Sequence, residues 1–277
     1  MNQIRTCPVC MHHCRLAPGQ LGRCRARKNE QGRIVSVNYG KVTALALDPI
    51  EKKPLRQFYP GSKILSVGSF GCNLSCPFCQ NHEISMCGEQ AADHVEMTPL
   101  QLADLAEEMQ KRGNIGVAYT YNEPLIGHEF VRDCAAIVHA RGMKNVVVTN
   151  GSVQLEILET LLPDIDAMNI DLKGFTAAHY QRLGGDLHTV QEFIARAARS
   201  THVEVTTLIV PGENDTEEEM AAEAEWLASI DPQIPLHVTR FFPHYRMQER
   251  AATDIALIYR LREVASAYLP HVYVGNC

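Results

Sequence analysis

From residue 62 onward, short apolar segments alternate with longer helical ones, and this alternation restricts the fold more than any other feature. The short segments are rich in β-branched residues, as strands buried on both faces are. Strands of this kind, each followed by a helix, form a parallel sheet. The expected strands span residues 64–70, 116–120, 145–149, 165–171, 203–210 and 236–242.

Helix start and stop signals lie between these strands. Thr98 is a suitable N-cap, with Pro99 at the first helical position, and Gly142 ends a later helix. Six strand–helix units are fewer than the eight of a closed barrel. We therefore predict an α/β fold, a partial and laterally open (β/α)6 barrel of the TIM type. Six helices are expected. The first begins at residue 99, and the others span residues 125–140, 154–162, 189–199, 216–229 and 253–268.

The first 60 residues have a different character, and we predict two domains. Residues 1–60 form a small Cys-rich metal-binding or cap segment, and residues 61–277 form the partial barrel. Within the first segment, residues 32–40 alternate apolar and polar side chains like a short strand. Residues 48–55, DPIEKKPL, are charged and bounded by prolines, which predicts an exposed loop.

A cysteine triplet follows the first expected strand, in the stretch GCNLSCPFCQN of residues 71–81. Cys72, Cys76 and Cys79 could give an iron–sulfur cluster three thiolates, whereas a four-iron cube normally takes four. One iron would then stay open, as in a reactive metal site. A partial zinc site or a redox pair is the alternative. The spacing, with Phe78 before the third cysteine, resembles the radical S-adenosylmethionine (SAM) superfamily, in which the open iron chelates SAM.

Four further cysteines lie close together near the N-terminus: Cys7, Cys10, Cys14 and Cys24. Four thiolates can close a tetrahedral zinc site, and the same four could hold a second iron–sulfur cluster. Metal binding would supply folding energy that so small a segment lacks. The alternative is a packed cap of unmetallated cysteines. The remaining thiols, Cys87, Cys134 and Cys277, are predicted to be free.

Polar residues follow the other expected strands, where barrel enzymes place their reactive groups. They include Glu123, Asn150, Asp171 and Lys173. A zwitterion that carries adenosine needs a carboxylate for its ammonium, a cation for its carboxylate, and amides or hydroxyls for its ribose. Each residue also has a plainer role, such as a helix-terminal carboxylate, an exposed ion pair or a turn asparagine.

Several motifs together resemble a narrower family. Much of the chain looks like the activating enzymes of glycyl-radical enzymes, of which pyruvate formate-lyase activating enzyme is the type. A closer resemblance is to the radical SAM component of the AmmeMemoRadiSam system. It is carried by the N-terminal cysteine pattern and by the motifs DPIEKKPL, GCNLSCPFCQN, YTYNEPL and HVYVGN. This resemblance spans nearly the whole chain.

The resemblance implies roles for individual residues. Glu123 would hold the SAM ammonium. Tyr121 and Asn122 replace the glycines that usually precede this glutamate, and Val148 stands where activating enzymes tend to have an aspartate. The full set of predicted cofactor-binding residues is Phe78 (against adenine), Asn81, Asn122, Glu123, Thr149 and Asn150 (ribose side), Asp171 and Lys173 (near the SAM carboxylate), and His244.

The implied reaction is reductive cleavage of SAM at a [4Fe–4S] cluster to methionine and a 5′-deoxyadenosyl radical, which abstracts hydrogen from a substrate. A flavodoxin- or ferredoxin-like donor would supply the electron, and the substrate could be a glycine-bearing protein loop. Alternatives are a small-molecule or other macromolecular substrate, an iron–sulfur electron carrier, and a zinc-organised interaction module.

Composition narrows the setting. The net charge of −6 and the lack of a long basic run do not indicate nucleic-acid binding. No apolar run is long enough to span a bilayer, and the first residues lack the apolar core of a signal peptide. Ten cysteines without an export signal suggest metal ligands and free thiols in the cytoplasm.

Overall fold

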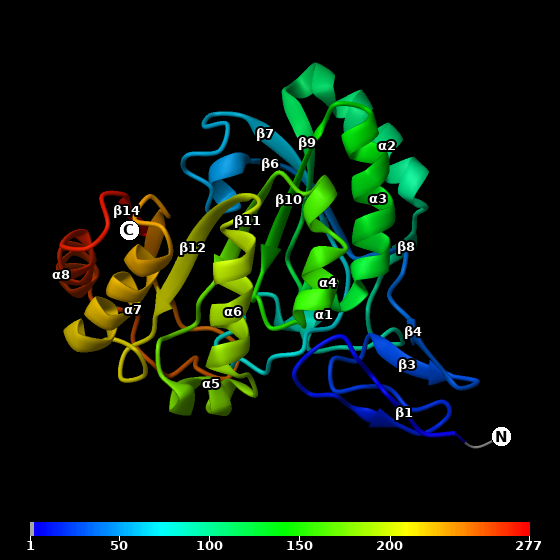
Figure 1. Ribbon diagram of the computed structural model, residues 1–277, viewed down its shortest axis with the longest axis horizontal. Coiled ribbons are helices and arrows are strands. Elements are labelled where there is room, and N and C mark those ends of the chain that lie inside the picture. Colours follow the sequence, from blue (N-terminus) through cyan, green and yellow to red (C-terminus); the bar gives the residue numbers. More distant parts are fainter. Residues whose placement is uncertain (1–2) are drawn as a thin grey trace.

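The computed structural model describes residues 3–277, and an eight-stranded sheet forms its centre (Figure 1). The strands follow the order β14-β13-β12-β11-β10-β9-β7-β6. Neighbouring strands from β7 to β14 are parallel, and β6 pairs antiparallel with β7. The strands are β6 (Ala44–Pro49), β7 (Lys63–Gly68), β9 (Asn114–Tyr119), β10 (Lys144–Thr149), β11 (Ala167–Asp171), β12 (His202–Ile209), β13 (Leu236–Arg240) and β14 (Val272–Gly275).

The predicted α/β class and partial barrel of parallel strands are confirmed, and all six expected strands form. The structure adds β14 at one edge of the sheet and β6 at the other. β14 has four residues, too few for a clear alternation of apolar side chains. β6 lies within residues 1–60 but belongs to the central sheet. The proposed domain boundary at residue 60 remains a prediction.

The prediction of an exposed loop over residues 48–55 is wrong. Asp48 ends up in β6, and the chain then turns through a short 3-10 helix, η1 (Ile50–Lys52). Ile50 and Leu55 are fully buried in a small core cluster that also contains Ile64. The segment is therefore partly buried although half of its residues are charged. Burying Lys53 is tolerated because Asp48, in the same segment, is its ion-pair partner.

Helices cover the outer face of the sheet. Thr98 forms a capping box with Gln101 and begins its helix as predicted, whereas α1 and α5 were not predicted. Three further 3-10 turns are η2 (Met109–Arg112), η3 (Pro124–Gly127) and η4 (Leu162–Asp164). The helices are α1 (His82–Ser85), α2 (Pro99–Glu108), α3 (His128–Ala140), α4 (Leu155–Glu159), α5 (Ala177–Leu183), α6 (Leu187–Ala197), α7 (Glu217–Ile230) and α8 (Ile255–Ser266).

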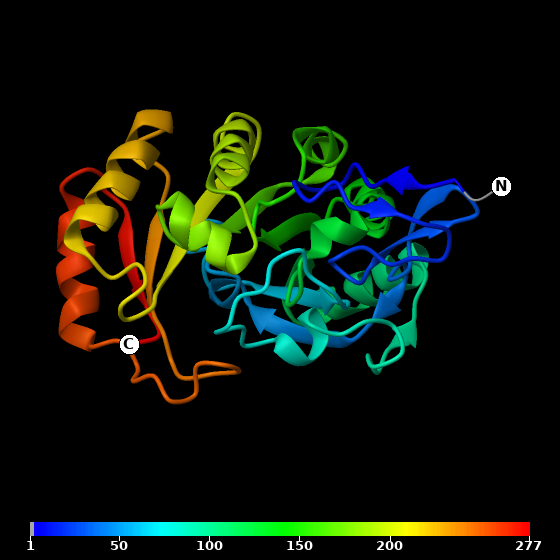
Figure 2. The ribbon, with the colours of Figure 1, turned by 90° about the horizontal axis from the view of Figure 1, so that it is seen from below.

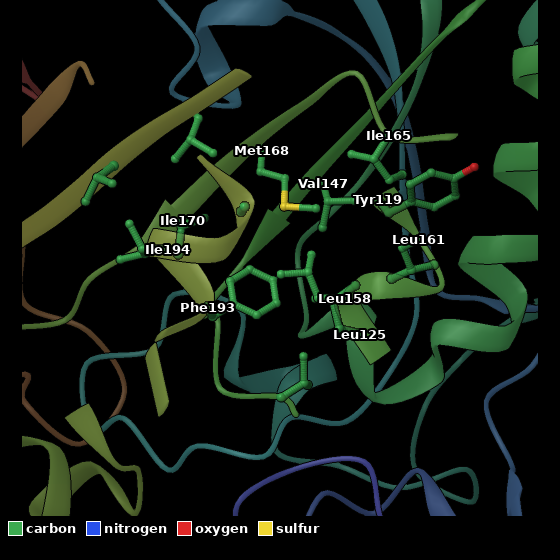
Figure 3. Packing of buried hydrophobic residues seen from close by; sticks show 14 of the residues in the cluster. Tyr119, Leu125, Val147, Leu158, Leu161, Ile165, Met168, Ile170, Phe193 and Ile194 are labelled. Atoms are coloured by element: carbon green, nitrogen blue, oxygen red, sulfur yellow. The ribbon is translucent and has the colours of Figure 1, made fainter. Parts of the chain in front are cut away.

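The main core lies between the sheet and these helices. Figure 3 shows strand side chains such as Val147 and Met168 packed with Leu158 of α4 and Phe193 of α6. Burial of a side chain of this size stabilises the fold by about 1.5–3 kcal/mol. Apolar residues fill most of this face of the sheet, although Thr207 of β12 donates a buried hydrogen bond to Glu223 of α7 there.

The N-terminal segment consists of small antiparallel pairs beside the cysteine end of the sheet (Figures 1 and 2). The Gln154 amide donates to the Val9 carbonyl, and Arg27 forms a bidentate ion pair with Glu129 of α3. No helix within residues 3–277 is long and apolar enough to cross a membrane. The short strands are β1 (Arg5–Thr6), β2 (Arg15–Leu16), β3 (Arg27–Glu30), β4 (Arg33–Ser36), β5 (Lys41–Val42) and β8 (Val95–Glu96).

Candidate active site

The cysteine triplet lies on the loop after β7, at the carboxyl end of the parallel strands. All three cysteines line one cavity of about 210 Å³, which we call the cysteine cavity. Residues from the ends of β9, β10 and β11 complete its wall. Eight of the nine predicted cofactor-binding residues line it: Phe78, Asn81, Asn122, Glu123, Thr149, Asn150, Asp171 and Lys173. His244 does not line it, and its ring lies 5.3 Å from that of His82.

The surroundings of the three sulfur atoms suit metal ligands. The Leu74 amide lies 3.4 Å from Cys72 Sγ and the Asn150 Nδ2 lies 3.6 Å from it, both as donors. Burial raises the pKa of the Cys72 thiol, and it raises that of Cys76 to about 11. Without a metal these groups are neutral thiols, so metal binding must release their protons. Three thiols on one loop, with donors to sulfur, fit an iron–sulfur cluster.

The four N-terminal cysteines also lie together. The Cys7 amide donates to the Cys14 carbonyl at 2.9 Å, and Cys7, Cys10 and Cys24 are buried. Burial, reinforced by the other three thiols, raises the pKa of Cys10 to about 12. Within residues 3–277, no three side chains of Cys, His, Asp or Glu surround a point where one metal ion could bind. Zinc or a second cluster at this quartet therefore stays a prediction.

The quartet is connected to the triplet through the backbone of the cysteine loop. His12 Nε2 lies 2.8 Å from the carbonyl oxygen of Asn73, which follows Cys72. A Cβ atom on Gly71 would lie 2.4 Å from the Cys24 carbonyl, and φ of Gly71 is +87°. Glycine is therefore required where the two cysteine segments meet.

Glu123 is at the centre of a hydrogen-bond network in the cysteine cavity. It is 2% exposed and accepts from the Leu125 amide, the Thr149 hydroxyl and the Asn150 amide, at 2.8–2.9 Å. Burial raises the pKa of Glu123 to about 7, although these donors favour the ionised form. A carboxylate has about four acceptor sites, so one remains for a further donor.

Two predicted ribose contacts are partly used within the protein. The Asn150 Nδ2 donates to Asn73 Oδ1 at 3.0 Å, and its Oδ1 accepts from the Ser152 amide. The Thr149 hydroxyl donates to Glu123 and accepts from the Gly151 amide. Both residues therefore position their neighbours, whatever they contact in addition.

Asp171 and Lys173 form an ion pair at 2.7 Å on the opposite wall. Burial lowers the pKa of Lys173, but the neighbouring Asp171 carboxylate opposes this, and the net pKa is raised. The lysine therefore keeps its charge. Because the two side chains are only partly exposed, the pair differs from a solvent-screened surface pair.

Sequence reasoning missed a buried polar cluster beside the cavity. The Tyr121 hydroxyl donates to Asp48 Oδ2 at 2.7 Å, and Lys53 Nζ donates to the same oxygen at 2.8 Å. Lys53 is 2% exposed, and its Nζ lies 4.7 Å from the centre of the Tyr121 ring. The sequence signal was DPIEKKPL, in which Asp48 and Lys53 lie five residues apart.

Asn81 and Asn122 hold the cysteine loop in place. The Asn122 amide group donates to the carbonyls of Phe70 and Gly71, and its oxygen accepts from the Ser69 amide. The Asn81 Nδ2 donates to the Tyr121 carbonyl at 2.7 Å. Tyr121 has a φ of +73°, a conformation more common for the glycine that the resemblance would place there.

The family model of the radical SAM superfamily matches residues 66–227, more than half of the chain. The chain therefore belongs to the radical SAM superfamily and is an enzyme of that class. Membership implies a [4Fe–4S] cluster and SAM, and such enzymes need an electron donor. The predicted superfamily is thus confirmed, whereas the closer resemblance to the AmmeMemoRadiSam component remains a prediction.

Individual relatives agree with this assignment. An uncharacterized protein of Methanocaldococcus jannaschii is 37% identical, over 99% of this chain and 82% of that protein. The 4-hydroxyphenylacetate decarboxylase activating enzyme of Clostridioides difficile is 29% identical, over 69% of this chain and 58% of that enzyme. A solved domain of a pyruvate-formate lyase-activating enzyme from Bacteroides vulgatus shares the fold, with a TM-score of 0.51 and 20% identity. That alignment covers 58% of this chain and 99% of the domain.

Proposed function

We propose that this enzyme cleaves SAM reductively in the cysteine cavity and abstracts a hydrogen atom from a substrate. The observation that carries this proposal is one cavity lined by three thiols, a carboxylate with a spare acceptor site, and a charged lysine. When bound, the cluster and SAM together supply a 5′-deoxyadenosyl radical, formed with methionine by one-electron reduction of the sulfonium.

The chain's own residues would bind and orient these groups. Cys72, Cys76 and Cys79 would hold three irons of the cluster. Glu123 would accept from the SAM ammonium at its remaining site, and Lys173 would face the SAM carboxylate. In the rest of the predicted set, Phe78 would contact adenine, Thr149 would face the ribose, and Asn81, Asn122, Asn150 and Asp171 would support these contacts, with His244 outside the cavity.

Two classes of substrate are candidates. Similarity to an enzyme named as the activator of a decarboxylase supports a protein substrate, and the sequence resemblance suggests a loop that carries a glycine. A small molecule is the alternative, and a separate cavity of about 690 Å³, between the segment after β6 and β14, favours it. The electron would come from a flavodoxin- or ferredoxin-like protein, and we expect both partners in the cytoplasm.

An anaerobic assay tests the proposal. The protein is reconstituted with iron and sulfide, reduced with dithionite and given SAM, and 5′-deoxyadenosine is measured. The wild type should form it, while Cys76→Ala should not. Cys87→Ala is the matched control, because Cys87 lies outside both cysteine sets. An electron carrier or a zinc-organised module would form no 5′-deoxyadenosine, and equal product from Cys76→Ala would refute the cysteine assignment.

The quartet needs a separate test, because we propose that it holds zinc or a second cluster. Cys7→Ala should lose that metal, measured by elemental analysis, and keep the absorbance of the triplet's cluster. An unchanged metal content in Cys7→Ala would contradict a metal at the quartet.

A further inference from the structure

A second cavity, of about 690 Å³, lies where the barrel is open. One side comes from the segment after β6, and the other from β14 and α8, so the cavity occupies the gap between the two edges of the sheet. Its size is typical of a small-molecule site. We call it the edge cavity, lined among others by Lys52, Arg56, Thr206, His237, Arg262 and Tyr273.

Three cations surround the mouth of the edge cavity. Lys52 is highly exposed, and Arg56 and Arg262 come from opposite sides of the gap. Three carboxylates lie near them: Glu51 accepts from the Gly61 amide, Glu263 pairs with Arg262, and Asp48 lies 3.4 Å from Lys52 Nζ. Asp48 already pairs with the buried Lys53, and Arg56 has no ion-pair partner within residues 3–277, so this region keeps an excess of positive charge, which favours an anionic ligand.

The backbone at Arg56 is held in place by a buried carboxylate. Glu204, whose side chain is fully buried, accepts from the Arg56 amide at 2.9 Å and from the Gln57 amide at 2.8 Å. The Gln57 side chain in turn donates to the Tyr273 hydroxyl of β14 at 3.1 Å, across the gap. Hydrogen bonds beside the edge cavity thus connect the two edges of the barrel.

The lining of the edge cavity also contains a hydrogen-bonded histidine, His237. His237 Nε2 donates to Glu204 Oε2 at 2.6 Å, which orients the ring and leaves Nδ1 for another partner. These bonds, with a second histidine at Glu204 Oε1, lower the pKa of Glu204 to about 2 although burial opposes this. Glu204 therefore stays ionised and serves as an internal counterion.

A chain of side-chain contacts joins the edge cavity to the cysteine cavity. The Thr206 hydroxyl, in the edge cavity, donates to Asn169 Oδ1 at 2.6 Å. Asn169 Nδ2 donates to Asp171 Oδ1 at 3.1 Å, and Asp171 lines the cysteine cavity. Thr206 and Asp171 are register partners on neighbouring strands, which lie about 4.8 Å apart. The edge cavity and the cysteine cavity are therefore separated by a wall of these three side chains.

We propose that the edge cavity binds the substrate, and that this substrate is a small organic anion with a phosphate or carboxylate group held by Lys52, Arg56 and Arg262. The inference rests on the proposed function, because it assigns a substrate class to that reaction. The anionic group would lie at the mouth, and the reacting C–H bond would point inward toward Thr206.

Binding of small anions tests the inference without turnover. Inorganic pyrophosphate and citrate, which represent the two anionic groups, are titrated calorimetrically into the reconstituted protein at constant ionic strength. At least one should bind saturably. The triple variant K52Q/R56Q/R262Q should weaken that binding by roughly tenfold or more, the loss expected when charge-assisted hydrogen bonds are removed.

The triple variant K63Q/K111Q/R199Q is the matched control, because it removes the same charge from exposed positions outside both cavities. It should bind the anion like the wild type. Equal losses in both triple variants, or no saturable binding by the wild type, would overturn the inference. Binding of an acidic peptide in place of both small anions would overturn it too, in favour of a protein substrate.

A parallel measurement separates this inference from the proposed function. Cleavage of SAM without added substrate should be the same in K52Q/R56Q/R262Q and the wild type. If the wild type cleaves SAM but binds neither anion, only the substrate assignment is refuted. If the wild type binds an anion but neither it nor any variant cleaves SAM, the proposed reaction is refuted and the edge cavity remains an anion site.

Discussion

The cysteine cavity and the edge cavity lie on neighbouring strands but have opposite chemistry. The first is small and lined by thiols and carboxylates, with Lys173 as its cation. The second is larger and lined by three cations, Lys52, Arg56 and Arg262, against one carboxylate, Glu51. A sulfonium with an ammonium group matches the first, and an anion matches the second. The comparison suggests that one barrel keeps a cationic cofactor and an anionic substrate apart by charge.

The largest expected effect separates the two cavities by chemistry. Cys76→Ala removes a thiolate from the cysteine cavity, so 5′-deoxyadenosine formation should fall to background in the anaerobic assay. Pyrophosphate or citrate binding at the edge cavity should be unchanged in calorimetry. Loss of both 5′-deoxyadenosine formation and anion binding would mean that the two cavities are not independent.

The next effect concerns Glu204, the buried carboxylate beside the edge cavity. Glu204→Gln should lower the free energy of unfolding by about 3 kcal/mol, because two histidines and two backbone amides lose an ionised acceptor. The pKa of Glu204 is lowered from 4.5 to about 2 in the folded state. Its stabilisation is therefore present above pH 4.5 and is lost as the pH falls toward 2.

Urea unfolding at several pH values checks this prediction. The difference between wild type and Glu204→Gln should shrink across that pH range. A difference that does not change with pH would mean that the ionised carboxylate is not the source of the stability.

A smaller effect is expected for SAM affinity. Glu123→Gln removes the charge that would meet the SAM ammonium, so SAM should bind roughly 10- to 100-fold more weakly, as for a lost charge-assisted hydrogen bond. Equilibrium binding of SAM to the reconstituted protein measures this. Anion binding at the edge cavity is the internal control, and unchanged SAM affinity would refute the role of Glu123.

The smallest effect distinguishes the cavities by their exposure to solvent. Raising the salt concentration from about 0.03 M to about 0.3 M shortens the screening length roughly threefold. Anion binding at the exposed mouth should weaken several-fold, whereas SAM binding beside buried Glu123 should change less. Equal salt dependence of the two equilibria would remove this distinction.

The sequence predicted the cysteine cavity better than the edge cavity, for a physical reason. Cys72, Cys76 and Cys79 lie within one loop, and Glu123, Asn150 and Asp171 each follow a recognisable strand, so topology alone brings them together. The edge cavity depends on β14 and on residues 48–57, which come from opposite ends of the chain. Their meeting depends on where the barrel stays open.

The buried charges show the same limit. Lys53 seemed to belong to an exposed loop, because four of the eight residues in DPIEKKPL are charged and two are prolines. Its burial depends on Asp48 and Tyr121, which are 73 positions apart, and on the apolar anchoring of Ile50 and Leu55. Local composition carries no information about such partners.

The sequence by itself determined the six expected strands, the six expected helices and the ligand spacing of the cysteine loop, since these depend on residues close together in the chain. The tertiary structure decided which carboxylates lose water, which cations stay exposed, and which segments meet across the gap. Those properties depend on contacts between distant residues, and burial and charge have meaning for a site only after the chain has folded.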